Sequence, residues 1–202
     1  MPEPSRPALP GERSRTLAAA LLETLADRLE RDPLAVDATI LFTDLVGFSG
    51  WLLEAGDEAA LELLRTVAAV VEPTISAHHG RLVKRLGEGH MAVFTTALDG
   101  VSAALEMQTQ LVGLDGDRPP LRAGLHTGRP QKLSGDYLGT DVNIAARVGA
   151  AARPGEVLVT GAVRDAIDPA AGLSFKRRRG FRAKGTPAGL EVFVVRAGSG
   201  GG

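Results

Sequence analysis

Three groups of polar residues have the types and spacing needed for phosphate and metal chemistry. The first group begins with Asp44, which ends an apolar run that starts at Thr39, and continues into the turn Gly47-Phe48-Ser49. The run predicts a buried strand. A carboxylate at its end, beside backbone amides facing the same way, suits a metal ion together with phosphate oxygens. The alternative for Asp44 is a helix N-cap or a turn residue.

The second group surrounds the short loop Gly87-Glu88-Gly89, which separates apolar runs at 81–86 and 90–95. Two glycines between such runs predict a hairpin. If the hairpin lies beside the first strand, Asp44 and Glu88 come close together, and two neighbouring carboxylates repel unless a cation lies between them. A pair of divalent ions there would bind triphosphate oxygens and activate a hydroxyl for in-line attack on phosphorus.

The third group is Asp136, Asn143 and Arg147. Asn143 and Arg147 are four residues apart, so they project from one face of a helix. The guanidinium fork of Arg147 suits charge that builds on phosphoryl oxygens. Lys84 as donor and Asp136 as acceptor suit adenine, which offers an acceptor and an exocyclic amine. The alternatives are an exposed strand lysine, a turn aspartate and a surface helix arginine.

The elements that must position these groups follow from periodicity and turn residues. Helix 57–77 is expected to have Asp57 as its N-cap, to bury Leu61, Leu64, Ala68, Val71 and Ile75, and to kink or shorten at Pro73. The other expected elements are a helix at 99–112 begun by Asp99, a strand at 121–126, a polar loop at 127–135, a helix at 141–152, a strand at 156–160, a helix at 161–167, a basic strand or extended segment at 174–183 and a strand at 190–195. This order predicts an α+β sandwich with a mostly antiparallel sheet and a ferredoxin-like βαββαβ core.

Composition excludes several classes of protein. The 202 residues contain 23 Lys and Arg against 24 Asp and Glu, so bulk charge predicts no attraction to nucleic acid or membrane. There is no cysteine and no apolar run of the ~20 residues that span a bilayer. The N-terminus is a poor signal peptide, and we expect a cytoplasmic protein. The basic run 176–179, with Arg182 and Lys184, is interpreted as a charged edge strand rather than a nucleic-acid or membrane site.

Three regions are expected along the chain. Residues 1–36 combine a proline-rich disordered segment with an amphipathic helix at 14–31, which packs on the domain or pairs with its copy in a dimer. Residues 37–196 are expected to form the domain that carries the three groups of polar residues. Residues 197–202 form a flexible Gly/Ser tail.

Four blocks of sequence, in order and spacing, resemble the class III nucleotidyl cyclase catalytic domain. They are Phe42 to Ser49, Lys84 to Gly89, Gly135 to Gly139 and Asn143 to Arg147, and the resemblance runs from about Ala38 to Val195. The Asp136-Tyr137-Leu138-Gly139 block is similar to the bacterial adenylate cyclase subgroup.

The resemblance implies a role for each matching residue. Two Mg²⁺ or Mn²⁺ ions per site would be held by Asp44, Glu88 and the backbone carbonyl of Leu45. The turn residues Gly47, Phe48 and Ser49 would hold phosphates, Lys84 and Asp136 would select adenine, Asn143 would orient the ribose, and Arg147 would stabilise the transition state. The resemblance also implies a homodimer, in which one chain supplies the metal carboxylates and the other the purine, ribose and transition-state residues.

We therefore expect an adenylate cyclase that converts ATP to 3′,5′-cyclic AMP and pyrophosphate. One position departs from the family pattern, because the family usually has aspartate where this chain has Glu88. The extra methylene displaces the carboxylate, and misplacement by about 1 Å can cost roughly 10²-fold in rate. The alternative is therefore a catalytically weak or inactive cyclase-like module that binds nucleotide and dimerises. A guanylate cyclase is a third option, against which Lys84 and Asp136 argue.

Overall fold

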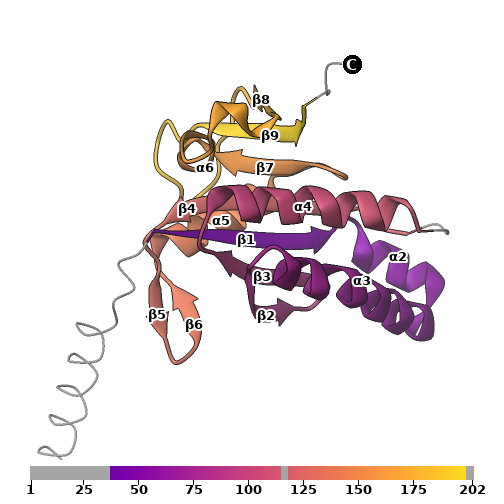
Figure 1. The fold of residues 1–202 in the computed structure, drawn as a ribbon. Helices are drawn as coiled ribbons and strands as arrows, with labels where there is room; N and C mark the ends of the chain where they lie inside the picture. Colours follow the sequence, from indigo (N-terminus) through magenta and orange to yellow (C-terminus); the bar gives the residue numbers. More distant parts are fainter. Residues whose placement is uncertain (1–36, 115–117, 199–202) are drawn as a thin grey trace, which may run out of the picture.

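The computed structural model describes residues 37–114 and 118–198, so the predicted helix at 14–31 and residues 199–202 of the predicted tail lie outside the described residues. Strands and helices are interspersed along the chain (Figure 1). The elements are β1 (Ala38–Leu45), α2 (Phe48–Ala55), α3 (Asp57–Ala77), β2 (Arg81–Leu86), β3 (Gly89–Phe94), α4 (Ala97–Val112), β4 (Leu121–Gly128), β5 (Gln131–Leu133), β6 (Asp136–Leu138), α5 (Thr140–Ala150), β7 (Val157–Thr160), α6 (Gly161–Asp165), the 3₁₀ helix η1 (Pro169–Ala171), β8 (Leu173–Arg177) and β9 (Val192–Ala197).

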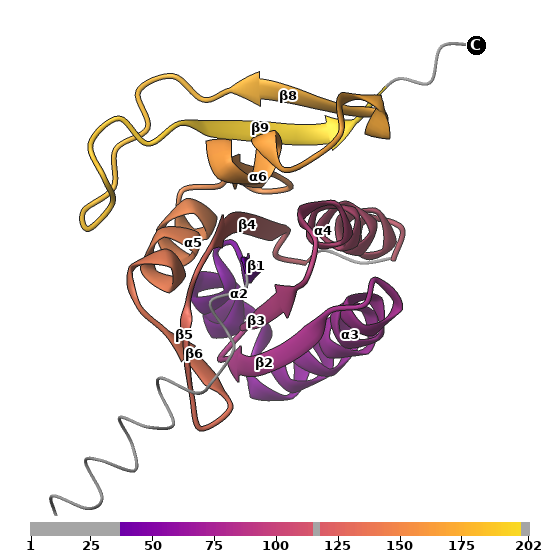
Figure 2. The ribbon, with the colours of Figure 1, turned by 60° about the vertical axis from the view of Figure 1, so that its left-hand side comes forward.

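The main sheet has seven strands in the order β2-β3-β1-β4-β7-β9-β8. Its first half, β1-α3-β2-β3-α4-β4, is the predicted βαββαβ core, and every strand pair in the sheet is antiparallel except β4 with β7. The α+β class and the mostly antiparallel sheet are therefore confirmed. Strands β7, β9 and β8 extend this core on the side of β4 (Figure 2).

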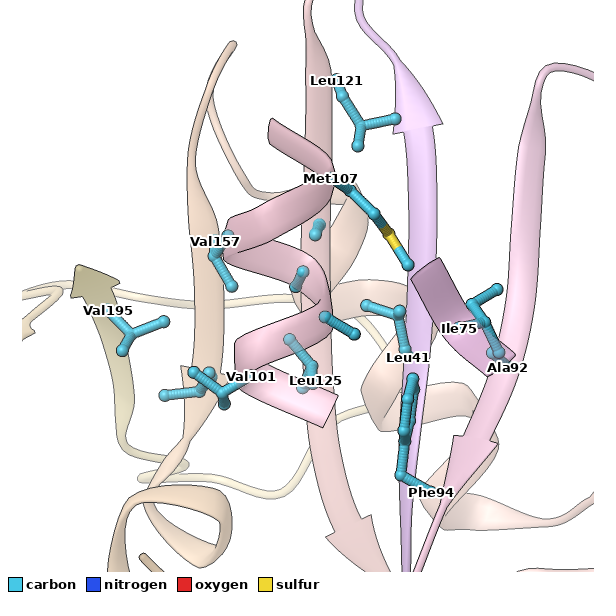
Figure 3. Packing of buried hydrophobic residues seen from close by; sticks show 14 of the residues in the cluster. Leu41, Ile75, Ala92, Phe94, Val101, Met107, Leu121, Leu125, Val157 and Val195 are labelled. Carbon is cyan, nitrogen blue, oxygen red and sulfur yellow. The ribbon is translucent and has the colours of Figure 1, made fainter. Parts of the chain in front are cut away.

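Helices cover the two faces of the sheet unequally, and β1 distributes its side chains between them. Leu41 and Leu45 join the main hydrophobic core with α3 and α4, where Val71 is fully buried. Figure 3 shows Leu41 beside the fully buried Met107 of α4. Ile40, one residue out of phase, packs on the opposite face with Tyr137 and Ala145 of the α5 side. Period-two alternation thus places Asp44 on the α5 face, in phase with Ile40.

Helix α5 packs directly on the backbone of β4, and a missing side chain makes this possible. A Cβ atom built on Gly124 of β4 would lie 2.0 Å from the backbone nitrogen of Gly149 in α5. No other residue fits at Gly124, because real Cβ atoms do not approach a backbone atom so closely. The close contact fixes α5, and with it the residues on its outer face, relative to the central strands.

Helix α3 differs in detail from its prediction. It begins at Asp57, but the N-cap is Gly56, and it continues through Pro73 to Ala77, so it is not shortened there. Val71 and Ile75 are buried as expected, whereas Leu61 is 54% exposed. Ala60, Leu63 and Val67 are the buried residues in the first half of the helix. The predicted buried face was therefore wrong by about one residue there.

The prediction of a polar loop at 127–135 was also wrong in part. Strand β4 continues to Gly128, and residues 131–133 pair with 136–138 as a separate two-stranded hairpin, β5–β6. Strands of three residues carry too little periodicity to be recognised. The basic segment expected at 174–183 forms a strand only over Leu173–Arg177. Among the described helices, none is both long and apolar enough to cross a membrane.

Candidate active site

The C-terminal end of β1 leads directly into a helix N-terminus. Gly47 is the N-cap of α2 in a left-handed conformation, with φ 78° and ψ 13°. No side chain caps this helix, and its first turn contains no acidic residue. The first amides of α2, including those of Phe48 and Ser49, therefore have no intrahelical acceptor, and such amides bind anions well.

Asp44 is paired with an arginine on the neighbouring strand. Asp44 and Arg122 are register partners between β1 and β4. The Nε atom of Arg122 donates to Asp44 Oδ2 at 2.9 Å, and its Nη2 atom donates to the same oxygen. Arg122 Nη1 also donates to the carbonyl oxygen of Ala150 at the end of α5 at 2.8 Å. Asp44 thus accepts hydrogen bonds as a strand-end carboxylate, rather than serving as the N-cap of α2.

Glu88 lies in the turn of the β2–β3 hairpin, next to the end of β1. The last paired residues of β1 and β3 are Thr43 and His90, so the turn continues this register past Asp44. A Cβ atom on Gly89 would lie 2.4 Å from the carbonyl oxygen of Thr43. The hairpin backbone is therefore pressed against β1, and the reach of the Glu88 carboxylate depends on its side-chain length.

The residues at the end of β1 fit a hard divalent cation. Within the described residues there is no cluster of three or more His, Cys, Asp or Glu side chains that could hold a metal ion. Asp44 and Glu88 supply two carboxylates and Leu45 a backbone carbonyl, all oxygen donors of the kind that Mg²⁺ prefers. Mg²⁺ is typically bound by one or two carboxylates plus phosphate oxygens and water. This donor set therefore fits a metal that arrives with a phosphorylated ligand.

Lys84 and Asp136 are 52 residues apart in sequence and in direct contact. Lys84 Nζ lies 2.6 Å from Asp136 Oδ2, and both side chains are more than a third exposed. The hydrogen bond from Lys84, together with that from the Tyr137 backbone amide, lowers the pKa of Asp136 below its usual value. The pair therefore presents a positive donor and an ionised acceptor side by side.

Tyr137 explains why this contact forms. Its side chain is only 6% exposed and packs with Ile40 and Met91 on the α5 face of the sheet. The guanidinium of Arg81 lies over its ring, 5.2 Å from the centroid. Because Tyr137 is held against the sheet, Asp136, the preceding residue of β6, is brought to the β2 edge where Lys84 lies.

Asn143 and Arg147 lie on the outer face of α5. Both are exposed, whereas Ile144 and Val148 beside them are buried against the sheet. Within the described residues, neither side chain forms a hydrogen bond or ion pair. Lys84 and Asp136 are thus in contact within one chain. In the described part of that chain, Arg147 makes no hydrogen bond or ion pair with the carboxylates at the end of β1.

Two polar contacts in this region were not predicted from the sequence. The contact of Arg122 with Asp44 is one of them, and its only local signal is an arginine near the start of β4. The other is a buried network around His126, whose Nδ1 lies 2.9 Å from Thr160 Oγ1 and whose Nε2 lies 3.2 Å from Asp141 Oδ1. Burial lowers the pKa of His126, against the opposing effect of Asp141. Asp141 also accepts a hydrogen bond from the Arg129 backbone amide at 2.8 Å, so the network ties the first turn of α5 to β4.

Comparison with known proteins gives a consistent match. Residues 33–197 match the model of the adenylate and guanylate cyclase catalytic domain. The chain is 31% identical, over 83% of its length, to a pH-sensitive adenylate cyclase of Mycobacterium tuberculosis, and 33% identical, over 65% of its length, to an adenylate cyclase of Glutamicibacter nicotianae. It spans 42% and 33% of those two relatives, less than half of either.

Solved structures show the same fold. A Trypanosoma brucei adenylate cyclase described in its monomeric state aligns with a TM-score of 0.76 at 18% identity, covering 84% of this chain and 93% of that one. The adenylyl cyclase CyaB of P. aeruginosa aligns with a TM-score of 0.68 at 21% identity, covering 79% and 93%. At these identities the likeness concerns the fold alone.

Proposed function

The chain belongs to the family of adenylate and guanylate cyclase catalytic domains, and from this we propose that it is an adenylate cyclase that converts ATP to 3′,5′-cyclic AMP and pyrophosphate. The observation that carries the choice of substrate is the contact between Lys84 Nζ and Asp136 Oδ2 at 2.6 Å. Two relatives that are named adenylate cyclases support it.

The ion pair matches the hydrogen-bonding edge of adenine. The ammonium of Lys84 would donate to the ring nitrogen N1, and the ionised Asp136 would accept from the exocyclic amine. Guanine presents a carbonyl where adenine has its amine, and that oxygen would face the carboxylate of Asp136 with no proton to share. A site built to hydrogen-bond one group of its ligand discriminates strongly against an analogue that lacks this group, because the polar group of the site is then left without a partner.

The end of β1 would hold the triphosphate. The uncapped amides of Phe48 and Ser49 would donate to phosphate oxygens. Arg122 of β4 would add a positive charge next to Asp44. Asp44, Glu88 and the carbonyl of Leu45 would bind Mg²⁺ or Mn²⁺; when bound, such ions neutralise phosphate charge and favour ionisation of the ribose 3′-hydroxyl. Attack of that hydroxyl on the α-phosphorus then displaces pyrophosphate.

Arg147 and Asn143 would act on the same nucleotide from a second copy of the chain. Asn143 would orient the ribose, and Arg147 would donate to the phosphoryl oxygens, on which negative charge increases in the transition state. Their exposure on α5 and their lack of partners among the described residues support a site completed across a two-fold interface. A symmetric homodimer built this way contains two equivalent sites.

A second candidate is a cyclase-like module with weak or no activity. Two observations favour it: Glu88 replaces the family's usual aspartate, and Asp44 is paired with Arg122. Such a module would still bind nucleotide and dimerise.

One assay separates the two candidates. Purified protein is incubated with ATP and Mn²⁺, and the product is identified as cyclic AMP by chromatography and mass spectrometry, with GTP in a parallel reaction. Cyclic AMP from wild type and its loss in Asp44→Ala support the cyclase. A silent wild type beside an active Glu88→Asp variant would establish the module, and preferential turnover of GTP would reverse the assignment of the base.

A further inference from the structure

A recess lies between the β8–β9 ribbon and the connection from α5 to β7. Its volume is about 730 Å³. Strand β8 is the edge strand at this end of the sheet (Figure 2). Six cationic side chains line it: Arg153, Lys176, Arg177, Arg178, Arg179 and Arg196. Glu156 is the one carboxylate among its lining residues.

The carboxylates nearby neutralise only part of this charge. Glu156 forms an ion pair with Arg178 and also accepts the backbone amide of Arg153 at 2.8 Å. Arg177 is paired with Glu191 at 2.7 Å. The side chains of the other four cations have no carboxylate partner among residues 37–114 and 118–198. These four are Arg153, Lys176, Arg179 and Arg196.

Protection of an edge strand does not account for this arrangement. Charged residues on β8 alone would prevent edge-to-edge association, yet Arg196 belongs to β9 and Arg153 follows α5. Ser174 pairs with Arg196, and Lys176 pairs with Val194, so Lys176 and Arg196 are diagonal neighbours on one face of the ribbon. Cations from three separate segments thus converge on one concavity, at a cost in mutual repulsion, in a chain whose formal net charge is −1.

We propose that this recess binds a small ligand that carries two or more adjacent phosphate groups. Arginine and lysine donors arranged around a concave surface suit clustered phosphate oxygens. A volume of about 730 Å³ is within the usual range for small-molecule sites, roughly 300–1,000 Å³. The concave shape favours a discrete molecule over a flat membrane surface or a long duplex. A free polyphosphate and a multiply phosphorylated lipid headgroup offer the same chemistry.

The test uses inorganic tripolyphosphate as the probe, with EDTA present so that divalent ions contribute nothing. Isothermal titration calorimetry compares the full chain with Lys176→Gln/Arg196→Gln. Because it loses two cationic hydrogen-bond donors, we expect the double variant to bind at least about tenfold more weakly. Arg65→Gln/Arg129→Gln removes two cations outside the recess and should bind like wild type. Neither double variant changes a residue of the proposed nucleotide site, so the difference in affinity between them measures the recess alone.

Further arms distinguish the sources of the phosphates and the rival ligands. Retention of the full chain on vesicles that contain a bisphosphorylated inositol lipid, lost in Lys176→Gln/Arg196→Gln, would identify a headgroup as the source, whereas tripolyphosphate binding alone identifies a soluble ligand. Equal binding by wild type and this variant overturns the proposal. Recess-dependent binding to duplex DNA or to phosphatidylserine vesicles, without binding to tripolyphosphate, also overturns it. None of these measurements involves cyclic AMP formation, so their outcome is independent of the cyclase assay.

Discussion

Arg122 of β4 and Asp44 of β1 lie opposite each other on adjacent strands, and two nitrogen atoms of the guanidinium donate to the single oxygen Asp44 Oδ2. The carboxylate that is proposed to receive a metal ion is thus already stabilised by a cation. A divalent ion that binds Asp44 must compete with Arg122, because two positive charges cannot share the oxygen without repulsion. Metal binding and the position of Arg122 should therefore be coupled.

Replacing Arg122 by glutamine should strengthen metal binding to the nucleotide-free protein. The substitution removes the competing charge, and we expect the Kd for Mn²⁺ to fall by at least about threefold, a conservative figure for a partly exposed ion pair. Electron paramagnetic resonance of free Mn²⁺ measures this directly. Arg129→Gln, which removes an exposed arginine paired with Asp37 instead, is the matched control, and an unchanged Kd in Arg122→Gln would disprove the competition.

Shortening Glu88 to aspartate should raise cyclase activity. The hairpin backbone is fixed against β1 by the close approach of Gly89 to Thr43, so side-chain length sets the carboxylate position. We expect kcat to increase by up to about 10²-fold, since misplacement by about 1 Å can cost that much. Glu88→Gln keeps the length, loses the charge and should lower kcat. If Glu88→Asp is no faster than wild type, the methylene is not what limits the reaction.

Removing the Lys84–Asp136 pair should reduce discrimination between ATP and GTP. Lys84→Met and Asp136→Ala each remove one charged hydrogen bond to the base, so the ratio of the kcat/KM values for ATP and GTP should fall roughly tenfold. Because the pKa of Asp136 is lowered by Lys84, the carboxylate stays ionised in mild acid, and the wild-type ratio should be constant between about pH 6 and 8. Lys132→Met, on the neighbouring strand β5, is the control and should leave the ratio unchanged.

Two inactive variants should restore activity when they share a dimer. Asp44→Asn inactivates the metal half of a site, and Arg147→Ala inactivates the other half. In a mixed dimer one site collects both substitutions and the other collects neither. Random pairing at equal concentrations gives half mixed dimers with one working site each, so cyclic AMP formation should reach about a quarter of the wild-type rate. Co-expressed, differently tagged chains provide the measurement, and no recovery would place both halves of the site within one chain.

The stability of the domain should decrease as the pH falls through the range of histidine titration. Burial lowers the pKa of His126, so between that value and about 6.5 the unfolded chain binds a proton that the folded chain does not. The free energy of unfolding therefore falls with decreasing pH, by at most about 1.4 kcal/mol per pH unit for this group. His90, also buried with a lowered pKa, contributes in the same direction.

Urea unfolding of wild type and His126→Gln at pH 7.5, 6.5 and 5.5 measures the contribution of His126. The variant should be less stable at pH 7.5, because it loses the contacts with Thr160 and Asp141. Its stability should depend less steeply on pH than that of wild type. Parallel curves would show that His126 does not titrate in this range.

The sequence alone determined the elements whose signals are local. Periodicity located β1, α3 and α4, and the two glycines around Glu88 located the hairpin, because each pattern is complete within a few turns or strands. The order of these elements was enough for the α+β class and the βαββαβ core. The four sequence blocks identified the family, although the roles of their residues stay predictions.

The contacts between distant side chains depend on the tertiary structure. Arg122 reaches Asp44 because β1 and β4 pair in one register across 78 residues, and Lys84 reaches Asp136 because the buried Tyr137 holds a three-residue strand against the sheet. Arg153 and Arg196 join the basic run of β8 for the same reason, since strand order brings together segments that no local pattern connects. The sequence shows which side chains are available at each position. Strand register and helix packing decide which of them meet, and both depend on how distant segments are buried together in the core.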